Sequence, residues 1–344
     1  MQSVNNPGPA PIASVPLGTD GPRVGVQGLG CMGMSFAYGP TDANAARATL
    51  ERALELGVTL YDTADMYADG ENEKFIAPFI RANRDEVTLA SKFALGVDPQ
   101  DPQKRVIRND RPYLRSCIEG SLRRLGVETI DLYYMHRRDL RVPIEDTVGS
   151  MAELVQEGKV RQLGLSEVTG AELRAAHAEH PIAAVQSEWS VFSRDVERTA
   201  VPAAKELGVA FVPYSPLGRG FLTGAFVDAE ADLPADDFRR TMPRFTGGNA
   251  AKNAELLAPL RQIAEAHEAT PAQIALAWVH GQAALRGMTV VPIPGTRKPS
   301  RVEENTAVTA IELTQAERAL LEPLAGQVAG PRYADVSFSS AGRE

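Results

Sequence analysis

The sequence predicts an α/β fold: a closed (β/α)8 barrel of the TIM type, with an N-terminal β-hairpin and long loops at its C-terminal face. Two observations favour this fold. Short apolar runs alternate with helical patterns along the chain, and no change in composition divides its 344 residues. We therefore expect a flexible tail at residues 1–14, one domain at 15–325, and a C-terminal loop or tail at 326–344.

The first elements are two short extended runs, residues 15–18 and 22–26, on either side of Asp20-Gly21. This dipeptide favours a hairpin because both residues tolerate positive φ. Eight strands are expected after residue 25, at 26–30, 58–63, 87–92, 130–136, 160–166, 183–188, 209–215 and 289–294. Their nearly continuous apolar character is typical of parallel strands that are covered on both faces.

Helices are expected between these strands. Residues 44–56 carry apolar side chains at steps of three and four. A second helix follows Asp110 and ends at Gly126, and Thr270 and Thr314 each begin a helix with a capping sequence. The alternation stops in two segments, 218 to about 253 and from Gly326 onward, which we expect to be loops that cover a pocket.

Composition excludes several classes of function. The chain is 44% hydrophobic and 23% charged, as in ordinary globular proteins, and its net charge of -8 disfavours nucleic acid as a partner. The first fourteen residues resemble no signal peptide, and no apolar stretch is long enough to span a membrane. Cys31 and Cys117 match no metal or redox spacing, so we expect a cytoplasmic protein without a bound metal.

Four polar side chains follow the C-terminal ends of three expected strands: Asp62 and Tyr67, then Lys92, then His136. In a barrel these ends meet at one face. Reduction of a carbonyl needs a hydride on carbon and a proton on oxygen, and a tyrosine can donate that proton if its phenolate is stabilised. We expect Lys92 to lower the pKa of Tyr67, Asp62 to hold Lys92 charged, and His136 to orient the carbonyl.

The whole chain resembles the aldo-keto reductases, especially bacterial members similar to pyridoxal reductases and to potassium-channel β-subunits. The resemblance rests on several motifs in the same order: GLGCMGMS, YDTADMY, ASK, IDLYYMHR, GLSE, QSEWS, PYSPLGRGFLTG and IPGTRKPSRVEEN. It implies an oxidoreductase that reduces an aldehyde or ketone with NADPH, with a small carbonyl compound as its partner. It also implies a catalytic tetrad of Asp62, Tyr67, Lys92 and His136, in which Tyr67 is the general acid.

The resemblance further implies the residues that bind NADPH. Ser166 and Gln186 would contact the carboxamide, with Glu167 where many members have Asn, and Tyr214 would stack on the nicotinamide. The turn at 215–220 would offer backbone N–H groups to the pyrophosphate. The full expected set is Gly30, Cys31, Met32, Asp62, Ser166, Glu167, Gln186, Tyr214, Ser215, Pro216, Leu217, Gly218, Arg219, Gly220, Ile293, Gly295, Thr296, Arg297, Arg301, Glu304 and Asn305.

Arg301 indicates a preference for NADPH over NADH, because a planar guanidinium can pair with the 2′-phosphate. Gly295 stands where the family often has Lys, so part of the usual positive charge is missing. Arg297 and Lys298 are the candidates to replace it.

Two other interpretations remain open at this point. Residues 28–33, GLGCMG, match the dinucleotide fingerprint of Rossmann dehydrogenases, but no helix follows directly and Asp62 comes too late for the acidic position. The second alternative is a barrel that binds NADPH as a regulatory or interaction module, as the potassium-channel β-subunits do. Turnover of any carbonyl would distinguish an enzyme from such a module.

The substrate pocket is expected to contain Met34, Phe36, Trp189 and the two loops, which suggests an apolar or aromatic aldehyde. Arg137 and Arg138 follow the catalytic His136 and offer charge for an anionic substrate. Paired arginines after a strand are more often surface charges, and that is the expectation here.

Overall fold

The computed structural model describes residues 10–98, 101–335 and 339–343. A parallel sheet of seven strands forms its centre, in the spatial order β11-β10-β9-β8-β5-β4-β3. The strands are β3 (Leu29–Gly30), β4 (Leu60–Asp62), β5 (Thr88–Phe93), β8 (Ile130–Met135), β9 (Val160–Ser166), β10 (Ile182–Glu188) and β11 (Ala210–Tyr214). The predicted (β/α)8 class is confirmed, and the Rossmann alternative is wrong because residues 28–33 belong to the first barrel strand and a 3-10 turn.

The eighth predicted strand, 289–294, closes the barrel without forming a regular strand. Val291 and Ile293 donate their N–H groups to β11, and the carbonyl of Pro292 accepts from Gly28 at 2.9 Å. Parallel bridges join Val290 to Phe211 and Gly295 to Gly30. Because prolines lack the N–H that a ladder needs, Pro292 and Pro294 explain why pairing toward β3 is incomplete.

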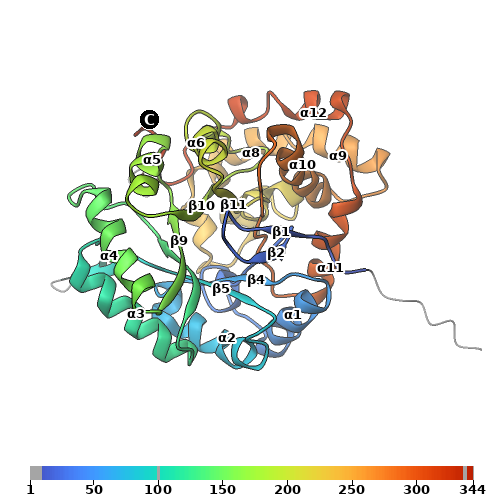
Figure 1. Cartoon of the computed structure of the whole chain (residues 1–344). Coiled ribbons are helices and arrows are strands. Elements are labelled where there is room, and N and C mark those ends of the chain that lie inside the picture. Colours follow the sequence, from blue (N-terminus) through green and yellow to red (C-terminus); the bar gives the residue numbers. More distant parts are fainter. Residues whose placement is uncertain (1–9, 99–100, 336–338, 344) are drawn as a thin grey trace, which may run out of the picture.

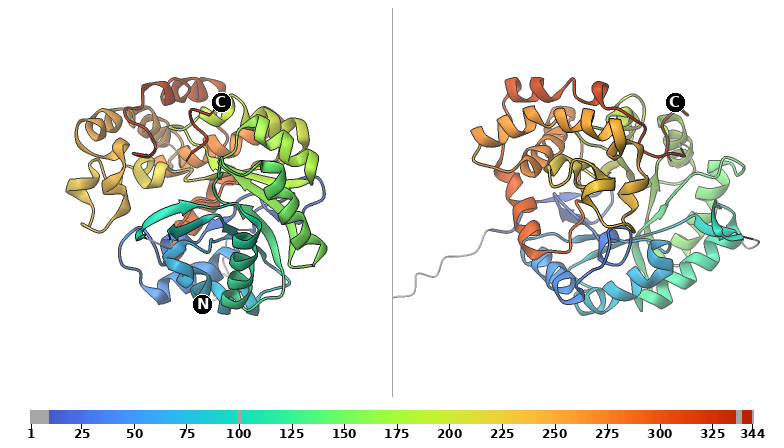
Figure 2. Two further views of the ribbon diagram at one scale, coloured as in Figure 1. Left: turned by 90° about the vertical axis from the view of Figure 1, so that its left-hand side faces the viewer. Right: turned by 180° about the vertical axis from the view of Figure 1, so that it is seen from behind.

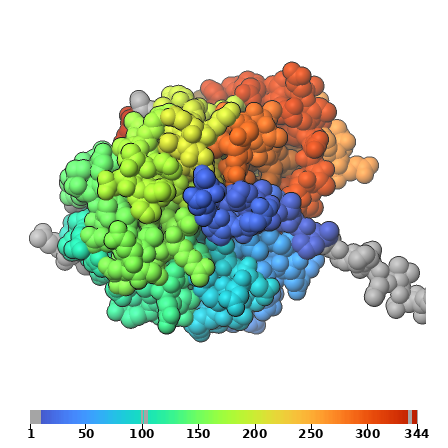
Figure 3. Space-filling model, viewed as in Figure 1, coloured from blue at the N-terminus to red at the C-terminus, as the bar shows by residue number. Residues whose placement is uncertain are grey.

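The N-terminal hairpin covers the end of the barrel at which the strands begin. Its strands are β1 (Ser14–Pro16) and β2 (Arg23–Gly25), which pair antiparallel. The turn is longer than the two residues expected, since the N–H of Leu17 donates to the carbonyl of Pro22. Gly18 has φ +79° and packs against the backbone of Ala183, where a Cβ would lie 2.5 Å from the carbonyl oxygen. Figures 1 and 3 show the hairpin across the centre of this face.

Helices surround the barrel (Figure 1). They are α1 (Ala43–Glu55), α2 (Glu71–Ala82), α3 (Arg111–Leu125), α4 (Ile144–Gln156), α5 (Gly170–Glu179), α6 (Ala200–Leu207), α9 (Ala258–Ala266), α10 (Pro271–Arg286), α11 (Pro299–Ala307) and α12 (Gln315–Leu321). The capping predictions are confirmed: the carboxylate of Asp110 accepts from Tyr113, and Thr270 and Thr314 form capping boxes. No helix in the described ranges is long and apolar enough to cross a membrane.

The opposite face differs from the expectation of structureless loops. Residues 218–255 contain η4 (Gly218–Thr223), α7 (Ala229–Asp232), η5 (Phe238–Thr241), η6 (Pro243–Phe245) and α8 (Gly247–Glu255). These short elements bury Phe221, Phe226 and Phe245 against one another, and this packing orders the segment. A second antiparallel hairpin, which no sequence pattern predicted, consists of β6 (Leu95–Asp98) and β7 (Asp101–Ile107). The view from behind in Figure 2 shows the 218–255 segment on this face.

Both terminal segments contact the barrel where they are described. Residues 1–9 of the expected tail lie outside the described residues, but the N–H of Ile12 donates to Leu56 at 2.9 Å and Ser14 begins β1. The boundary at residue 14 is therefore too late. In the C-terminal segment, Arg332 and Ser340 are buried.

Candidate active site

A cavity of about 1030 Å³ lies where the barrel strands end. Most of the residues predicted for the site line it. They are Gly30, Met32, Phe36, Asp62, Tyr67, His136, Gln186, Tyr214, Ser215, Pro216, Leu217, Arg219, Gly220, Ile293, Gly295, Thr296, Arg297, Arg301, Glu304 and Asn305. The C-terminal segment also contributes, through Tyr333, Ala334 and Asp335.

The polar centre of the site is a buried ion pair between Lys92 on β5 and Asp62 on β4. The ammonium also donates to the carbonyl of Thr63 at 2.7 Å, and Gln186 on β10 donates to the other carboxylate oxygen of Asp62 at 2.8 Å. Burial alone would lower the pKa of Lys92, but Asp62 and Tyr67 outweigh it and raise that pKa. The pair therefore keeps a charged lysine beneath the cavity.

Tyr67 begins the short helix η2 (Tyr67–Gly70), directly above this pair. The Lys92 ammonium is 5.3 Å from the centroid of its ring, Phe36 stacks on it at 6.2 Å, and His136 meets it edge-on at 5.9 Å. Burial raises the pKa of Tyr67, and Lys92 and Arg137 oppose that rise. The expected effect of Lys92 is present, but the expected net lowering of this pKa is wrong because burial outweighs it.

His136 follows β8, and its main-chain N–H donates to Phe93 at 2.8 Å, which fixes the start of the loop. Burial lowers its pKa well below the usual value, and the nearby charges of Arg137 and Lys92 act in the same direction. The imidazole is therefore neutral near pH 7. Its Nδ1 atom is buried without a hydrogen-bond partner among the described residues, while the ring lines the cavity.

Glu167 occupies the position expected to contact the carboxamide, but it does not line the cavity. Its carboxylate is fully buried and forms two hydrogen bonds of 3.0 Å with Arg332 from the C-terminal segment. The main-chain N–H of Ser340 donates to it at 2.8 Å. Although burial opposes ionisation, Arg332 and Arg137 hold the pKa of Glu167 at about 2. Its predicted contact with the cofactor is thus replaced by a contact with the tail.

The backbone explains why this position is unusual. Glu167 has φ +53°, a left-handed conformation that asparagine tolerates much better than glutamate. An ion pair with Arg332 offsets the strain, because both charges are buried and hydrogen-bonded.

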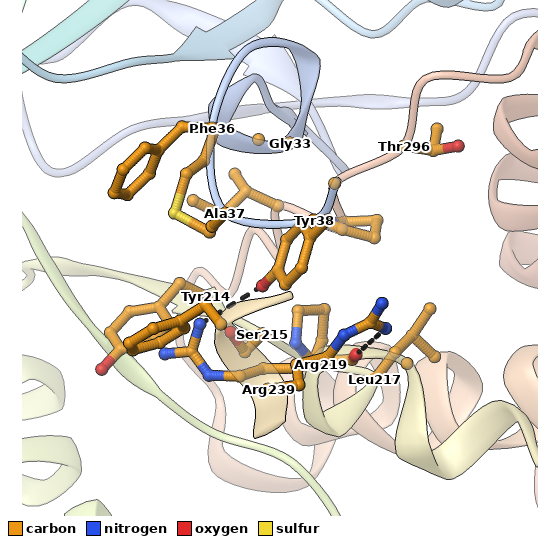
Figure 4. Close-up of a pocket in the computed structure, with 18 of the residues that line it drawn as sticks. Gly33, Phe36, Ala37, Tyr38, Tyr214, Ser215, Leu217, Arg219, Arg239 and Thr296 are labelled. Atoms are coloured by element: carbon orange, nitrogen blue, oxygen red, sulfur yellow. Dashed lines mark hydrogen bonds between the residues drawn. The ribbon is translucent and has the colours of Figure 1, made fainter. Parts of the chain in front are cut away.

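A chain of hydrogen bonds extends from Glu167 across the cavity. The hydroxyl of Tyr214 donates to Glu167 at 2.8 Å and lies 3.1 Å from the hydroxyl of Tyr333. The guanidinium of Arg219 donates to Tyr333 at 2.8 Å and to Tyr38 at 3.3 Å. Figure 4 shows the hydrogen bond between Arg219 and Tyr38 as a dashed line. The tail thereby connects the ring expected to face the nicotinamide with the turn expected to hold the pyrophosphate.

The cations predicted to bind the phosphate groups of the cofactor differ in the contacts that they already make. Arg297 donates to the carbonyls of Gly39 and Tyr38 and to the Thr41 hydroxyl, at 2.8–3.0 Å, so it holds the loop after β3. Arg301 and Lys298 line the cavity, and among the described residues neither side chain has a hydrogen-bond or ion-pair partner. These two cations, rather than Arg297, are available to an anion.

The turn at 215–220 also differs in part from the expectation. Gly218 and Gly220 have φ of +53° and +92°, which suits a tight turn. Their N–H groups are already used, donating to Ser215 and Leu217 at 2.9 and 3.0 Å. These two glycine N–H groups are therefore not free for a pyrophosphate, and Gly218 does not line the cavity.

Several predicted pocket residues lie in the core instead. Met34 and Trp189 are buried away from the cavity lining, and Trp189 donates to Glu197 at 2.9 Å and packs edge-on against Trp278. Their predicted role in the substrate pocket is wrong because apolar side chains near strand ends can as easily point outward, between sheet and helices. Cys31 and Ser166 are buried behind the cavity wall, and burial raises the pKa of the Cys31 thiol.

The two arginines after His136 are not the surface charges expected. Arg137 is buried and lines the cavity, with its guanidinium carbon 5.9 Å from the centroid of Tyr214. Arg138 is half-buried and donates to the carbonyl of Val142 at 2.5 Å. The periodicity of the sequence does not reveal that these two arginines are buried, because residues far apart in the sequence surround them.

Proteins of similar sequence indicate the family of this chain. The model of the aldo/keto reductase family matches residues 28–325. A Glycine max protein named probable aldo-keto reductase 1 is 43% identical over 328 residues, which cover 94% of this chain and 92% of that protein.

Solved structures resemble the chain over nearly its whole length. Glycerol dehydrogenase from Gluconobacter oxydans has a TM-score of 0.79 at 28% identity, covering 92% of this chain and 96% of its own. An aldo/keto reductase from Klebsiella pneumoniae, solved with NADP and acetate, has a TM-score of 0.66 at 26% identity, covering 93% of this chain and 98% of its own. The matched sequence, the barrel and the site place this chain in the aldo/keto reductase family.

Proposed function

We propose that this protein reduces an aldehyde or ketone to the alcohol with NADPH, and that Tyr67 gives the proton to the carbonyl oxygen. One observation carries the proposal: a buried Lys92–Asp62 pair lies beneath the ring of Tyr67, with a neutral His136 at its edge. This arrangement supplies a proton donor and a hydrogen-bond donor at one point of a large cavity.

The residues around the cavity fit NADPH. When bound, NADPH supplies the hydride that reduces the carbonyl carbon. Tyr214 would face the nicotinamide, and Gln186, which lines the cavity, would contact its carboxamide. Arg301 and Lys298, which have no partner among the described residues, would hold the phosphate of the adenosine end.

The chain's own residues then account for the proton. The raised pKa of Tyr67 keeps the phenol protonated near pH 7, as a donor requires. The raised pKa of Lys92 keeps a positive charge beside the phenolate that forms when the proton leaves. His136, being neutral, would donate one hydrogen bond to the carbonyl oxygen and orient it toward Tyr67.

The experiment that tests this proposal is NADPH oxidation by the purified protein against aromatic aldehydes, pyridoxal, dicarbonyls and aldoses. We expect turnover with NADPH preferred over NADH. Tyr67→Phe should lower kcat by about 10²- to 10⁴-fold and leave the Kd for NADPH unchanged. Tight NADPH binding without turnover on any carbonyl would contradict the enzyme and favour a regulatory module.

Both cysteines are free thiols, which supports a reducing compartment such as the cytoplasm.

A further inference from the structure

Arg137 places a buried positive charge next to the reaction centre. It directly follows His136 at the end of β8 and lines the same cavity as Tyr67. One terminal nitrogen donates to the carbonyl of His136 at 2.6 Å and to the hydroxyl of Ser166 at 3.2 Å. Its Nε atom is buried and has no hydrogen-bond partner among the described residues. Part of the donor capacity of this guanidinium is therefore unused.

Arg137 has no direct ion-pair partner among the described residues. Glu167 acts on it electrostatically from a longer distance, but that carboxylate is already paired with Arg332. The other groups that face it are the phenols of Tyr67, Tyr214 and Tyr333. A buried charge without a counter-ion is costly, so a ligand that brings a negative charge would be stabilised there.

The remaining cations of the cavity differ from Arg137. Arg219 is bound to Tyr333 and Tyr38, and Arg105 of β7 pairs with Asp69 at 3.3 Å. Arg239 pairs with Asp237 at 2.7 Å, and Arg297 holds the loop after β3. Arg301 and Lys298 belong to the segment after the closing strand, which the proposed function gives to the cofactor. Of these cations, Arg137 is the one that adjoins the catalytic histidine.

We propose that the carbonyl substrate carries a carboxylate, and that Arg137 binds this group while the carbonyl faces Tyr67 and His136. The aromatic stack of Phe36 on Tyr67 favours a flat or apolar body between the two polar ends. This inference rests on the proposed reductase function and names its substrate class: aldehydes or ketones that also carry an acid group.

The test compares two substrates that differ in one charge, 4-formylbenzoate and its methyl ester, with NADPH as reductant. The wild-type protein should prefer the acid by about tenfold or more in kcat/KM, because the carboxylate forms a charge-assisted hydrogen bond that the ester cannot form. Arg137→Met should remove this preference, mainly through a higher KM for the acid, so that the ratio of kcat/KM for acid and ester falls to about one. Loss of the charge beside Tyr67 and His136 changes kcat for both substrates, and such a common change cancels in the ratio. The Kd for NADPH should stay within about threefold. Arg137→Lys should retain part of the preference.

A matched control is Arg141→Met. Arg141 lies in the same loop and pairs with Asp139, but its side chain is 76% exposed. This variant removes the same charge and should leave the preference for the acid intact, which separates direct binding from long-range attraction. A second measurement needs no variant. Benzoate should competitively inhibit reduction of the aldehyde in the methyl ester substrate, and benzamide should inhibit this reaction at least tenfold more weakly.

Three outcomes would overturn the inference. One is equal kcat/KM for acid and ester in the wild-type protein. Another is equal inhibition by benzoate and benzamide. The third is an Arg137→Met variant in which kcat/KM falls by the same factor for acid and ester and NADPH binds more weakly. That result would indicate that Arg137 binds the carboxamide of the cofactor. If wild-type protein reduces neither these two substrates nor any other carbonyl, the proposed function itself fails and this inference fails with it.

Discussion

Glu167 and Arg332 form a bidentate ion pair, with both nitrogen–oxygen distances at 3.0 Å, although they lie 165 positions apart in the sequence. The pair joins the end of β9 to the C-terminal segment. Tyr214 donates to the same carboxylate, so the pair also fixes a ring that lines the cavity. Because Tyr333 follows Arg332 and lines the cavity too, this contact links the anchoring of the tail to the shape of the site.

Replacing Arg332 with Met should release the tail. Loss of Arg332 leaves Glu167 buried without its ion-pair partner, which costs about 3–5 kcal/mol unless the segment detaches and lets water reach the carboxylate. We expect a lower Tm, faster cleavage of the C-terminal segment in limited proteolysis, and a KM for the carbonyl raised several-fold. Glu167→Gln should have a smaller effect, because Arg332 keeps Asp195 at 3.2 Å and Glu188 at 3.7 Å.

The control for this prediction is Arg174→Met, which removes an exposed pair between Arg174 and Glu206 on neighbouring helices. Exposed pairs contribute little, so proteolysis and KM should match those of the wild-type protein. A tail in Arg332→Met that resists protease as well as the wild-type tail would show that the pair does not anchor it.

The pH dependence of turnover should be flat where histidines usually titrate. The pKa of His136 is lowered well below its usual value, so the ring stays neutral between pH 6 and 8. The pKa of Tyr67 is raised, so its proton is retained up to and beyond its ordinary pKa of about 10. We expect kcat for reduction to be constant from about pH 6 to 9. An inflection near pH 6.5 that disappears in His136→Gln would contradict a neutral His136.

Local patterns were sufficient to predict the barrel. Seven of the eight predicted strands are regular strands, because a continuous apolar run next to a capped helix is a local signal. The departures come from interactions that no local pattern encodes. Residues 95–98 and 101–107 have no continuous apolar run, yet they pair as an antiparallel hairpin. Residues 218–255 are ordered by aromatic side chains that pack only in the folded chain.

The distinction between local patterns and long-range interactions also applies to the site. Asp62, Tyr67, Lys92 and His136 were predictable because barrel geometry brings strand ends together. The role of Glu167 was not, since its partner Arg332 lies in a segment without periodicity. Arg137 is buried among residues that are distant in the sequence, including Ser166 and Tyr214, and for this reason the sequence alone favoured a surface charge.

Substitution of Arg301 and Arg297 should separate a cofactor contact from a structural one. Arg301 has no protein partner among the described residues, so Arg301→Ala should raise the Kd for NADPH by about 10- to 100-fold and the Kd for NADH by less than about threefold. Arg297 holds the loop through three hydrogen bonds, so Arg297→Ala should weaken both cofactors by a similar factor. Fluorescence titration gives all four constants, and equal weakening by Arg301→Ala would rule out its contact with the 2′-phosphate.

Asp65, two residues before Tyr67, should make the protein less stable as pH rises. Burial raises its pKa to about 7, and the neighbouring Glu73 acts in the same direction. Because this pKa exceeds the unfolded value of about 3.9, the folded state binds the additional proton between about pH 4 and 7, and the free energy of unfolding falls across that range. Asp65→Asn removes this proton-binding site and keeps an acceptor for Cys117. The variant should therefore have a higher Tm than the wild-type protein at pH 8, with a smaller difference at pH 5. A difference that is constant with pH would show that Asp65 is ionised in the folded protein throughout.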